Sequence, residues 1–311
     1  WCPDGSDRIV YSMKGKDGYY DLYMSNIKGT FDTCLTDKSK ILPNRHICCP
    51  AWDATGKWII FLAEKAVHPG SSTDALPGFG AYCDIWIMSA DAKKIYKIYD
   101  IPNDYDHGVI AARISPDGKH VVWTNRVERP KLMNPKQQAG YWSINYADFD
   151  FNKDGIPEVK NVRQYEPGER CFHECYGFSP DGSKLIFCSD YKTNQFLLEN
   201  IFTIDTAGNN LTQLTDGNYN EHSVYTPDSK HILWMSNKDC KNHGTDWWLM
   251  NPDGTDKKRL TYFNDPKNPM FMGKAVWAGL VSFSPDGKKF IGGVQKSLIT
   301  QEGKIVMGEF Q

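Results

Sequence analysis

Short stretches of alternating apolar and polar residues recur along the chain, and each follows a polar turn. Residues 119–123 (Lys-His-Val-Val-Trp) and 184–187 (Lys-Leu-Ile-Phe) are two clear examples. A period of two places successive side chains on opposite faces, which is typical of a β-strand with one face toward a core. The pattern therefore predicts many short strands.

A four-residue turn sequence, Ser-Pro-Asp-Gly or a close variant of it, precedes these strands and recurs along the chain. Proline presets the first turn position, aspartate bonds its own backbone and glycine accepts a positive φ, so the phrase predicts a hairpin and requires no catalytic explanation. The fourth residues of successive copies lie 47 to 64 residues apart, and this spacing fits one small sheet per repeat. The clear copies are 115–118, 179–182, 226–229 and 284–287, and the weaker copies are 2–5 and 53–56.

A second hairpin follows the first in most repeats. Two hairpins make a four-stranded antiparallel sheet, and several such sheets bury both faces only when they pack radially. We therefore predict an all-β fold, a six-bladed β-propeller of four-stranded antiparallel blades forming a single domain over residues 1–311. The expected blades are 1–43, 44–104, 105–168, 169–217, 218–265 and 266–311.

These phrases resemble the blades of the TolB-like, PD40-type (WD40-like) β-propeller family, which carry an S-P-D-G-K-x-I/L-x-F phrase. The resemblance covers nearly the whole chain. It implies the fold but not one activity, because the family includes translocation accessories, peptidase-associated propellers, lyases and sugar-binding modules.

The first and last repeats are shorter than the others. Residue 1 falls near the end of the expected innermost strand of the first blade, and the last repeat offers three strands, 280–283, 290–294 and 305–310. Ring closure is therefore expected to be incomplete in this chain. Either a further upstream segment completes it, or a partner covers an open blade edge.

Composition and charge narrow the partner classes. Hydrophobic residues make up 40% and charged residues 24% of the chain, and 36 Lys and Arg nearly balance 38 Asp and Glu. No basic block points to nucleic acid or anionic lipid, and no apolar run approaches the roughly 18 residues of a membrane helix. We therefore expect neither a nucleic-acid partner nor a membrane span.

Nine cysteines indicate an extracellular or periplasmic protein with some disulfides. The alternative is that small buried thiols simply fill a core. Residues 1–5 do not form a signal peptide, so either the start was processed or export is absent.

Polar residues at the innermost strands are candidate ligand contacts, because these strands surround a propeller's central channel. Several imidazoles and carboxylates there could bind a transition metal or perform acid–base catalysis. The alternative is that these side chains only line a solvent-filled channel. Oligogalacturonate lyases are a related propeller class with a His-rich metal site, although their motif cannot be matched residue by residue here. The expected ligand contacts are Arg45, His46, Asp106 and His107, and the catalytic candidates are His173, Glu174, Glu221 and His222.

A calcium loop is predicted in the third repeat. The sequence of residues 150–158 has the spacing D-x-N-x-D-G-x-x-E, which sets oxygen ligands at alternate positions around a sharp turn and suits Ca²⁺. The alternative is an acidic, solvated hairpin turn. The expected ligands are Asp150, Asn152, Asp154, Glu158 and the carbonyl of Ile156.

Taken together, the sequence favours a binding or scaffold module for a protein partner or a glycan at the propeller face. The chain lacks a nucleophile elbow, a P-loop, a dinucleotide glycine pattern, an H-E-x-x-H motif and the C-x-x-C-H of haem c, so neither a nucleotide nor haem c is expected. The alternative is a metal-assisted lyase or glycoside hydrolase acting on acidic polysaccharide.

Overall fold

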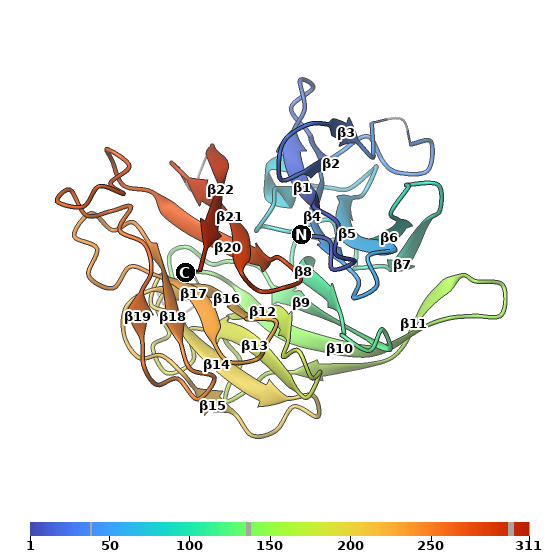
Figure 1. Cartoon of the computed structure of the whole chain (residues 1–311). Helices are drawn as coiled ribbons and strands as arrows, with labels where there is room; N and C mark the ends of the chain where they lie inside the picture. The colour runs from blue at the N-terminus through green and yellow to red at the C-terminus, as the bar shows by residue number, and fades with distance from the viewer. Residues whose placement is uncertain (38, 135–137, 298–301, 311) are drawn as a thin grey trace. The chain divides into compact units, whose positions relative to one another are not determined.

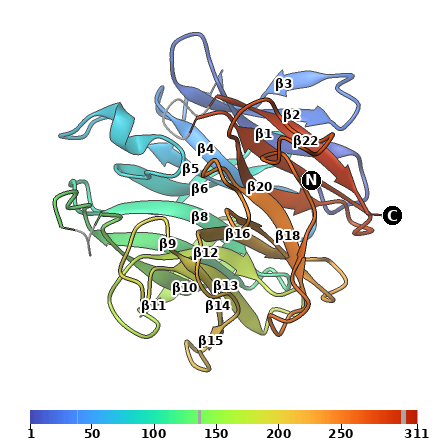
Figure 2. The same ribbon diagram turned by 90° about the vertical axis from the view of Figure 1, so that its left-hand side faces the viewer.

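The computed structural model describes residues 1–37, 39–134, 138–297 and 302–310. Within them the chain forms β-strands and one short 3₁₀ helix, η1 (Ser72–Ala75). Figure 2 shows η1 standing apart from the strands of its sheet, in the long loop between β5 and β6. No helix in the described part of the chain is long and apolar enough to cross a membrane.

The strands form six antiparallel sheets of consecutive strands (Figure 1). Four sheets have four strands, whereas the first and the last have three among the described residues. The predicted all-β, six-bladed fold is therefore confirmed, and the four-strand count fails only for the first and last sheets.

The chain divides into two compact units. The first comprises 1–132, 139–166 and 170–177, and the second comprises 133–138, 167–169 and 178–311. The single-domain assignment, with its blade ranges, stays a prediction.

Three sheets belong to the first unit. Their strands are β1 (Arg8–Lys14), β2 (Tyr20–Asn26) and β3 (Asp32–Cys34); β4 (Ile47–Trp52), β5 (Trp58–Glu64), β6 (Cys83–Ser89) and β7 (Ile95–Tyr99); β8 (Gly108–Ile114), β9 (His120–Glu128), β10 (Tyr141–Phe151) and β11 (Pro157–Tyr165). The last two strands form a long hairpin, green to yellow-green in Figure 1.

The other three sheets contain the strands of the second unit. They are β12 (His173–Phe178), β13 (Lys184–Ser189), β14 (Asn200–Asp205) and β15 (Thr212–Gln213); β16 (Asn220–Tyr225), β17 (Ile232–Ser236), β18 (Asp246–Met250) and β19 (Lys258–Arg259); β20 (Trp277–Phe283), β21 (Lys289–Gln295) and β22 (Gly303–Glu309). Most of β12 belongs to the first unit.

The turn phrase closes the first hairpin of each clear repeat in the same way. Ser115 Oγ lies 2.5 Å from Asp117 Oδ1 and accepts a hydrogen bond from the backbone N of His120 at 2.9 Å. Gly118 adopts a φ of 72°, as the turn requires. The hydrogen bond from Ser115 holds the pKa of Asp117 below its ordinary value. Equivalent bonds form at Ser179–Asp181, Thr226–Asp228 and Ser284–Asp286.

A β-bulge interrupts the first strand of four sheets. The register shifts between Cys48 and Ala51, between Ile110 and Arg113, between Glu221 and Val224, and between Ala278 and Val281. In three of these bulges a residue other than glycine adopts a positive φ, namely Cys49, Ala111 and His222. Such bulges redirect side chains and are frequent beside functional sites.

Each unit has its own apolar core. Trp123 is fully buried in the first unit with Ile60, Ile85 and Phe149, whereas Trp247 is buried in the second unit against Phe263 and Phe290. These two strand tryptophans thus serve in packing, because burial of their large apolar side chains stabilises the fold.

The disulfides expected from the sequence are not formed. All nine cysteines lie among the described residues, and no disulfide joins any two of them. Six of the thiols are buried, and four of these six lie on strands, where small apolar side chains are favoured in the core; the six are Cys2, Cys48, Cys83, Cys171, Cys175 and Cys188.

Candidate functional site

Arg45 and His46 lie just before β4 and contact the β1–β3 sheet. Arg45 Nη1 donates a hydrogen bond to Tyr19 Oη at 2.9 Å, and the His46 ring packs edge-on against the Tyr19 ring at 5.1 Å. His46 Nδ1 accepts a hydrogen bond from the backbone N of Tyr20 at 3.2 Å. Burial lowers the pKa of His46, so its neutral form is favoured. In this position His46 links two sheets of the first unit.

Glu64, which the sequence analysis did not single out, is a buried centre of hydrogen bonds at the end of β5. One carboxylate oxygen accepts from Ser72 Oγ at 2.5 Å and lies 2.6 Å from His68 Nε2, and the other accepts from the backbone N of His46 at 3.1 Å. The carboxylate thereby fixes the η1 loop onto the sheet. A single strand-end glutamate gives no sequence signal for this role.

Asp106 and His107 lie in the loop that enters β8. His107 Nδ1 is 2.8 Å from Asp104 Oδ1, and Arg129 Nε is 3.8 Å from Asp106 Oδ1. The buried Arg126 guanidinium donates hydrogen bonds to three backbone carbonyls of this loop, those of residues 105, 106 and 107. Arg126 therefore sets the conformation of the loop.

Tyr105 is the half-exposed centre of the same loop surface. Its side chain is 37% exposed. The guanidinium carbons of Arg126 and Arg129 lie 5.6 and 5.5 Å from the centre of its ring, and the Tyr82 ring lies 6.2 Å away. Tyr82, Tyr105, His107, Arg126 and Arg129 are called the Tyr105 rim below. The rim combines a partly exposed tyrosine ring with two arginine side chains that lie over it.

Glu221 and His222 lie on β16, at its bulge. Tyr219 Oη donates to Glu221 Oε2 at 2.5 Å, and Cys188 Sγ donates to Oε1 at 3.8 Å. Burial raises the pKa of Glu221 to about 7 and lowers the pKa of His222 to about 4.

Glu199, immediately before β14, is a second buried carboxyl group that the sequence analysis missed. Its backbone carbonyl accepts from the backbone N of Asn220 at 3.0 Å, which ties this residue to β16. Its Oε1 accepts from the backbone N of Leu197 at 3.1 Å, whereas its buried Oε2 has no hydrogen-bond partner among the described residues. Burial, together with the charge of Glu221, raises the pKa of Glu199 well above its ordinary value.

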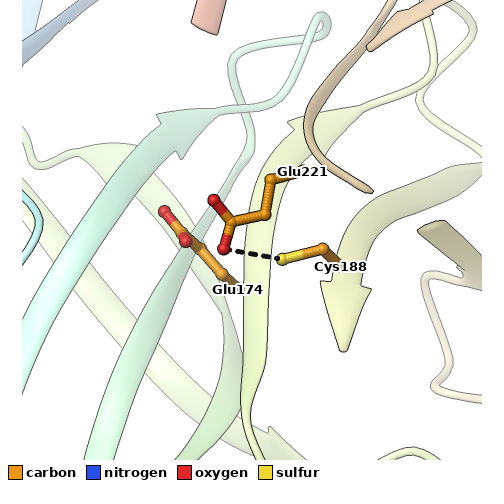
Figure 3. Close-up of side chains that lie close together, drawn as sticks. All are labelled: Glu174, Cys188 and Glu221. Carbon is orange, nitrogen blue, oxygen red and sulfur yellow. Dashed lines mark hydrogen bonds between the residues drawn. The ribbon is translucent and has the colours of Figure 1, made fainter. Parts of the chain in front are cut away.

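Figure 3 shows Glu174, Cys188 and Glu221. Their ligand atoms lie within 4.8 Å of one another, and they form the one such group of His, Cys, Asp and Glu side chains among the residues that the structure describes. Glu174 is on β12, Cys188 on β13 and Glu221 on β16. Thus two of the four catalytic candidates come together, joined by a cysteine that sequence reasoning did not assign.

None of the four histidines of the sequence analysis belongs to this group. His46 and His107 have the contacts given above. His173 is buried, with its Nε2 at 3.6 Å from Cys171 Sγ, and His222 is buried at the β16 bulge.

The predicted calcium residues form the turn between β10 and β11. Asn152 Oδ1 accepts hydrogen bonds from the backbone N of Asp154 and of Ile156, at 2.9 and 3.1 Å, and Asn152 Nδ2 donates to Glu158 Oε1 at 2.8 Å. Asp150 is paired with Glu158 across the hairpin. This is an asparagine-closed turn with its carboxylates at the surface, and calcium binding stays a prediction.

Comparison with known proteins identifies the fold. No family model matches the chain, and no curated protein matches it. Among solved structures, TolB from Acinetobacter baumannii matches 98% of this chain with a TM-score of 0.65 and 17% identity. A putative TolB from Agrobacterium tumefaciens matches 97% of this chain with a TM-score of 0.59 and 17% identity. An oligogalacturonate lyase in complex with manganese matches 100% of this chain with a TM-score of 0.54 and 14% identity.

The chain spans 62% of the length of the A. baumannii protein, 86% of the A. tumefaciens protein and 88% of the lyase. At these identities the matches show the fold, which is a TolB-like six-bladed β-propeller. A shared fold leaves the activity to be argued from the site.

Proposed function

We propose that this chain is a β-propeller binding module that recognises a glycan at the Tyr105 rim. The observation that carries the proposal is the half-exposed Tyr105 ring, flanked by two arginines. A flat aromatic face packs against the C–H face of a sugar ring, and fixed charged groups beside it bind hydroxyl or carboxylate oxygens. Loops on a rigid β scaffold are a common place for recognition.

Preorganisation supports this assignment. The backbone around Tyr105 is fixed by three hydrogen bonds from Arg126, so little conformational entropy remains to be lost on binding. Arg129 is more exposed, and its contact with Asp106 is long at 3.8 Å, which leaves its guanidinium able to pair with a ligand. The TolB-like fold supports an extracellular or periplasmic location for such a module.

The test is binding of neutral and uronic-acid oligosaccharides, measured by calorimetry. We expect Tyr105→Ala and Arg129→Ala each to weaken binding about tenfold, which corresponds to about 1.4 kcal/mol. Arg163→Ala is the matched control, because Arg163 lies 4.8 Å from the Tyr146 ring on the β10–β11 hairpin, outside the rim. Undiminished affinity in Tyr105→Ala would refute glycan binding at this rim. If the chain binds none of the sugars but binds a protein through Tyr105, the ligand of the rim is that protein and the glycan proposal is wrong.

We also propose that Ca²⁺ stiffens the β10–β11 hairpin. Asp150, Asp154 and Glu158 supply carboxylates within one turn, and hard oxygen ligands are what Ca²⁺ prefers. Millimolar Ca²⁺ should raise the melting temperature of the wild-type chain but not that of Asp154→Asn. Equal melting curves of the wild-type chain with Ca²⁺ and with a chelator would rule out this role.

A second candidate function is a metal-assisted lyase acting on acidic polysaccharide. It is favoured by the buried Glu221 carboxyl, which is in contact with Cys188 Sγ, and by the fold shared with an oligogalacturonate lyase solved in complex with manganese. In this case the carboxyl group would provide acid–base catalysis beside the ion. Ultraviolet detection of unsaturated product from polygalacturonate, with and without Mn²⁺, tests it, and no product from the purified chain would reject it.

A further inference from the structure

The bulge of β4 contains two adjacent cysteines, Cys48 and Cys49. In a regular strand neighbouring side chains point to opposite faces, so two adjacent thiols do not meet. Here the register of β4 against β5 shifts between Cys48 and Ala51, and Cys49 adopts a φ of 57°. The backbone N of Cys49 donates to Ser12 Oγ at 3.1 Å, which holds the bulge in place. In this conformation the two thiols are hydrogen-bonded to each other.

The two thiols have different surroundings. Cys48 is 1% exposed, whereas Cys49 is half-buried. The hydrogen bond from Cys48 lowers the pKa of Cys49. Burial opposes this effect, and the charge of Arg113 and a backbone hydrogen bond from Gly78 reinforce it. The same thiol–thiol hydrogen bond, together with burial, raises the pKa of Cys48 well above its ordinary value.

This asymmetry fits the two roles in thiol–disulfide exchange. The thiolate is the nucleophilic form of cysteine, and a neighbouring positive charge favours it. Cys49 therefore has the features of an attacking thiol, and the buried Cys48 beside it is placed to resolve the product. Both cysteines, Arg113 and Gly78 belong to the first unit.

We propose that Cys48 and Cys49 are a redox-active dithiol that reacts with small-molecule disulfides and closes to a Cys48–Cys49 disulfide. The Cys49 thiolate attacks one sulfur of the disulfide compound, which leaves a mixed disulfide on Cys49 and releases one thiolate. Cys48 then attacks the Cys49 sulfur, and its proton passes to the second departing thiolate. In total the two cysteines lose two electrons and the compound is reduced to two thiols.

The bond between neighbouring cysteines should be easily reversed. Consecutive Cα atoms are about 3.8 Å apart across a trans peptide bond, whereas ordinary disulfides join Cα atoms about 4.4 to 6.8 Å apart. The resulting strain makes a disulfide easier to reduce, and strained disulfides are those that act reversibly. The proposed role is thus a thiol–disulfide switch in β4. It is independent of glycan binding, because the Tyr105 rim shares no residue with the pair.

The experiment uses the whole folded chain, reduced and then incubated with oxidised glutathione. The remaining thiols are alkylated in denaturant, and trypsin releases residues 46–57, a peptide whose only cysteines are Cys48 and Cys49. We expect this peptide to lack two hydrogen atoms and to carry no alkyl group. After incubation with excess reduced glutathione it should return to the doubly alkylated form.

Two variants separate the roles of the thiols. Cys48→Ser keeps a hydroxyl donor beside Cys49 but cannot resolve, so it should accumulate a glutathione adduct on Cys49. Cys49→Ser lacks the attacking thiol, so Cys48 should carry only the alkyl group. The matched control is Cys34→Ser, which removes a half-buried thiol on β3 and should form the Cys48–Cys49 bond as the wild type does.

The wild-type measurement does not depend on how any variant folds. A doubly alkylated peptide from the oxidised wild type would overturn the proposal, as would a glutathione adduct that persists on Cys49 in the wild type. A glutathione adduct on Cys48 in Cys49→Ser would show that Cys48 attacks first, and it would overturn the assigned roles.

Discussion

His46 stabilises the start of β4 through a ring nitrogen that carries no proton. Its Nδ1 accepts the hydrogen bond from the backbone N of Tyr20, and its ring packs on Tyr19. A protonated imidazole donates from both nitrogens, so protonation would abolish this bond. The side chain is 4% exposed, and its burial outweighs the opposing charge of the nearby Glu64 in setting the pKa.

Stability should therefore fall in mild acid because of His46. Its folded pKa lies below the unfolded value of about 6.5, so its contribution is complete above that value and is lost as the pH falls toward the folded pKa. Glu64 and Asp17 oppose this effect, and Lys14 and Arg45 reinforce it. His46→Asn keeps an acceptor but does not titrate, so its melting temperature should decline less than that of the wild type from about pH 7 to about pH 5.

The matched control is His120→Asn, since the His120 side chain is about one-third exposed and shares none of the His46 contacts. Its pH profile should follow the wild type. Parallel profiles for His46→Asn and the wild type would show that His46 is not the group that titrates.

At the scale of elements, the turn phrases were sufficient to predict the sheets but not their bulges. Each clear Ser/Thr-Pro-Asp phrase forms the expected turn, because its hydrogen bonds are local. The bulges depend on how a whole strand packs, and no glycine marks Cys49, Ala111 or His222 as a positive-φ position. A bulge therefore leaves little trace in the sequence.

The same distinction explains the site. Glu221 was predicted from its place before a turn, but its partner Cys188 is 33 residues away on another sheet. Glu64 and Glu199 were missed because a glutamate beside a strand normally lies in solvent, and only tertiary packing buries these two. The disulfide expectation failed for a related reason, since a cysteine count does not reveal which thiols meet.

The β8 bulge allows a direct test of backbone strain. Ala111 has a φ of 55°, a conformation that costs a residue with a Cβ about 1 kcal/mol, whereas glycine adopts it freely. The gain is partly offset by the larger unfolded-state entropy of glycine. Ala111→Gly should therefore change the free energy of unfolding by less than about 1 kcal/mol in either direction.

Ala112→Gly is the control. Ala112 is the next residue, is fully buried in the core and does not have a positive φ. It should lower the free energy of unfolding by at least about 1 kcal/mol, because it removes a buried methyl group and adds backbone entropy. Denaturant unfolding of both variants tests this difference. Equal losses in the two variants would mean that the bulge carries no strain at Ala111.

At the scale of the whole molecule, β22 is the edge strand of a sheet with three strands among the described residues. An edge strand presents unpaired backbone groups, and proteins usually protect it with charged side chains. Here Ile305 and Met307 are 47% and 51% exposed on one face of β22. The net charge of −2 gives little electrostatic repulsion between copies of the chain.

We therefore predict that two copies of the chain associate through β22. Sedimentation velocity at increasing concentration should show a dimer in the wild type, and Ile305→Lys combined with Met307→Lys should keep the chain monomeric without lowering its melting temperature, because both side chains already face solvent. Leu132→Lys combined with Met133→Lys is the matched control. It adds the same charge at two apolar residues that are even more exposed and that lie in the loop between β9 and β10. If both double variants abolish the dimer, net charge drives dissociation and the β22 edge is not the contact; if neither does, the copies meet elsewhere.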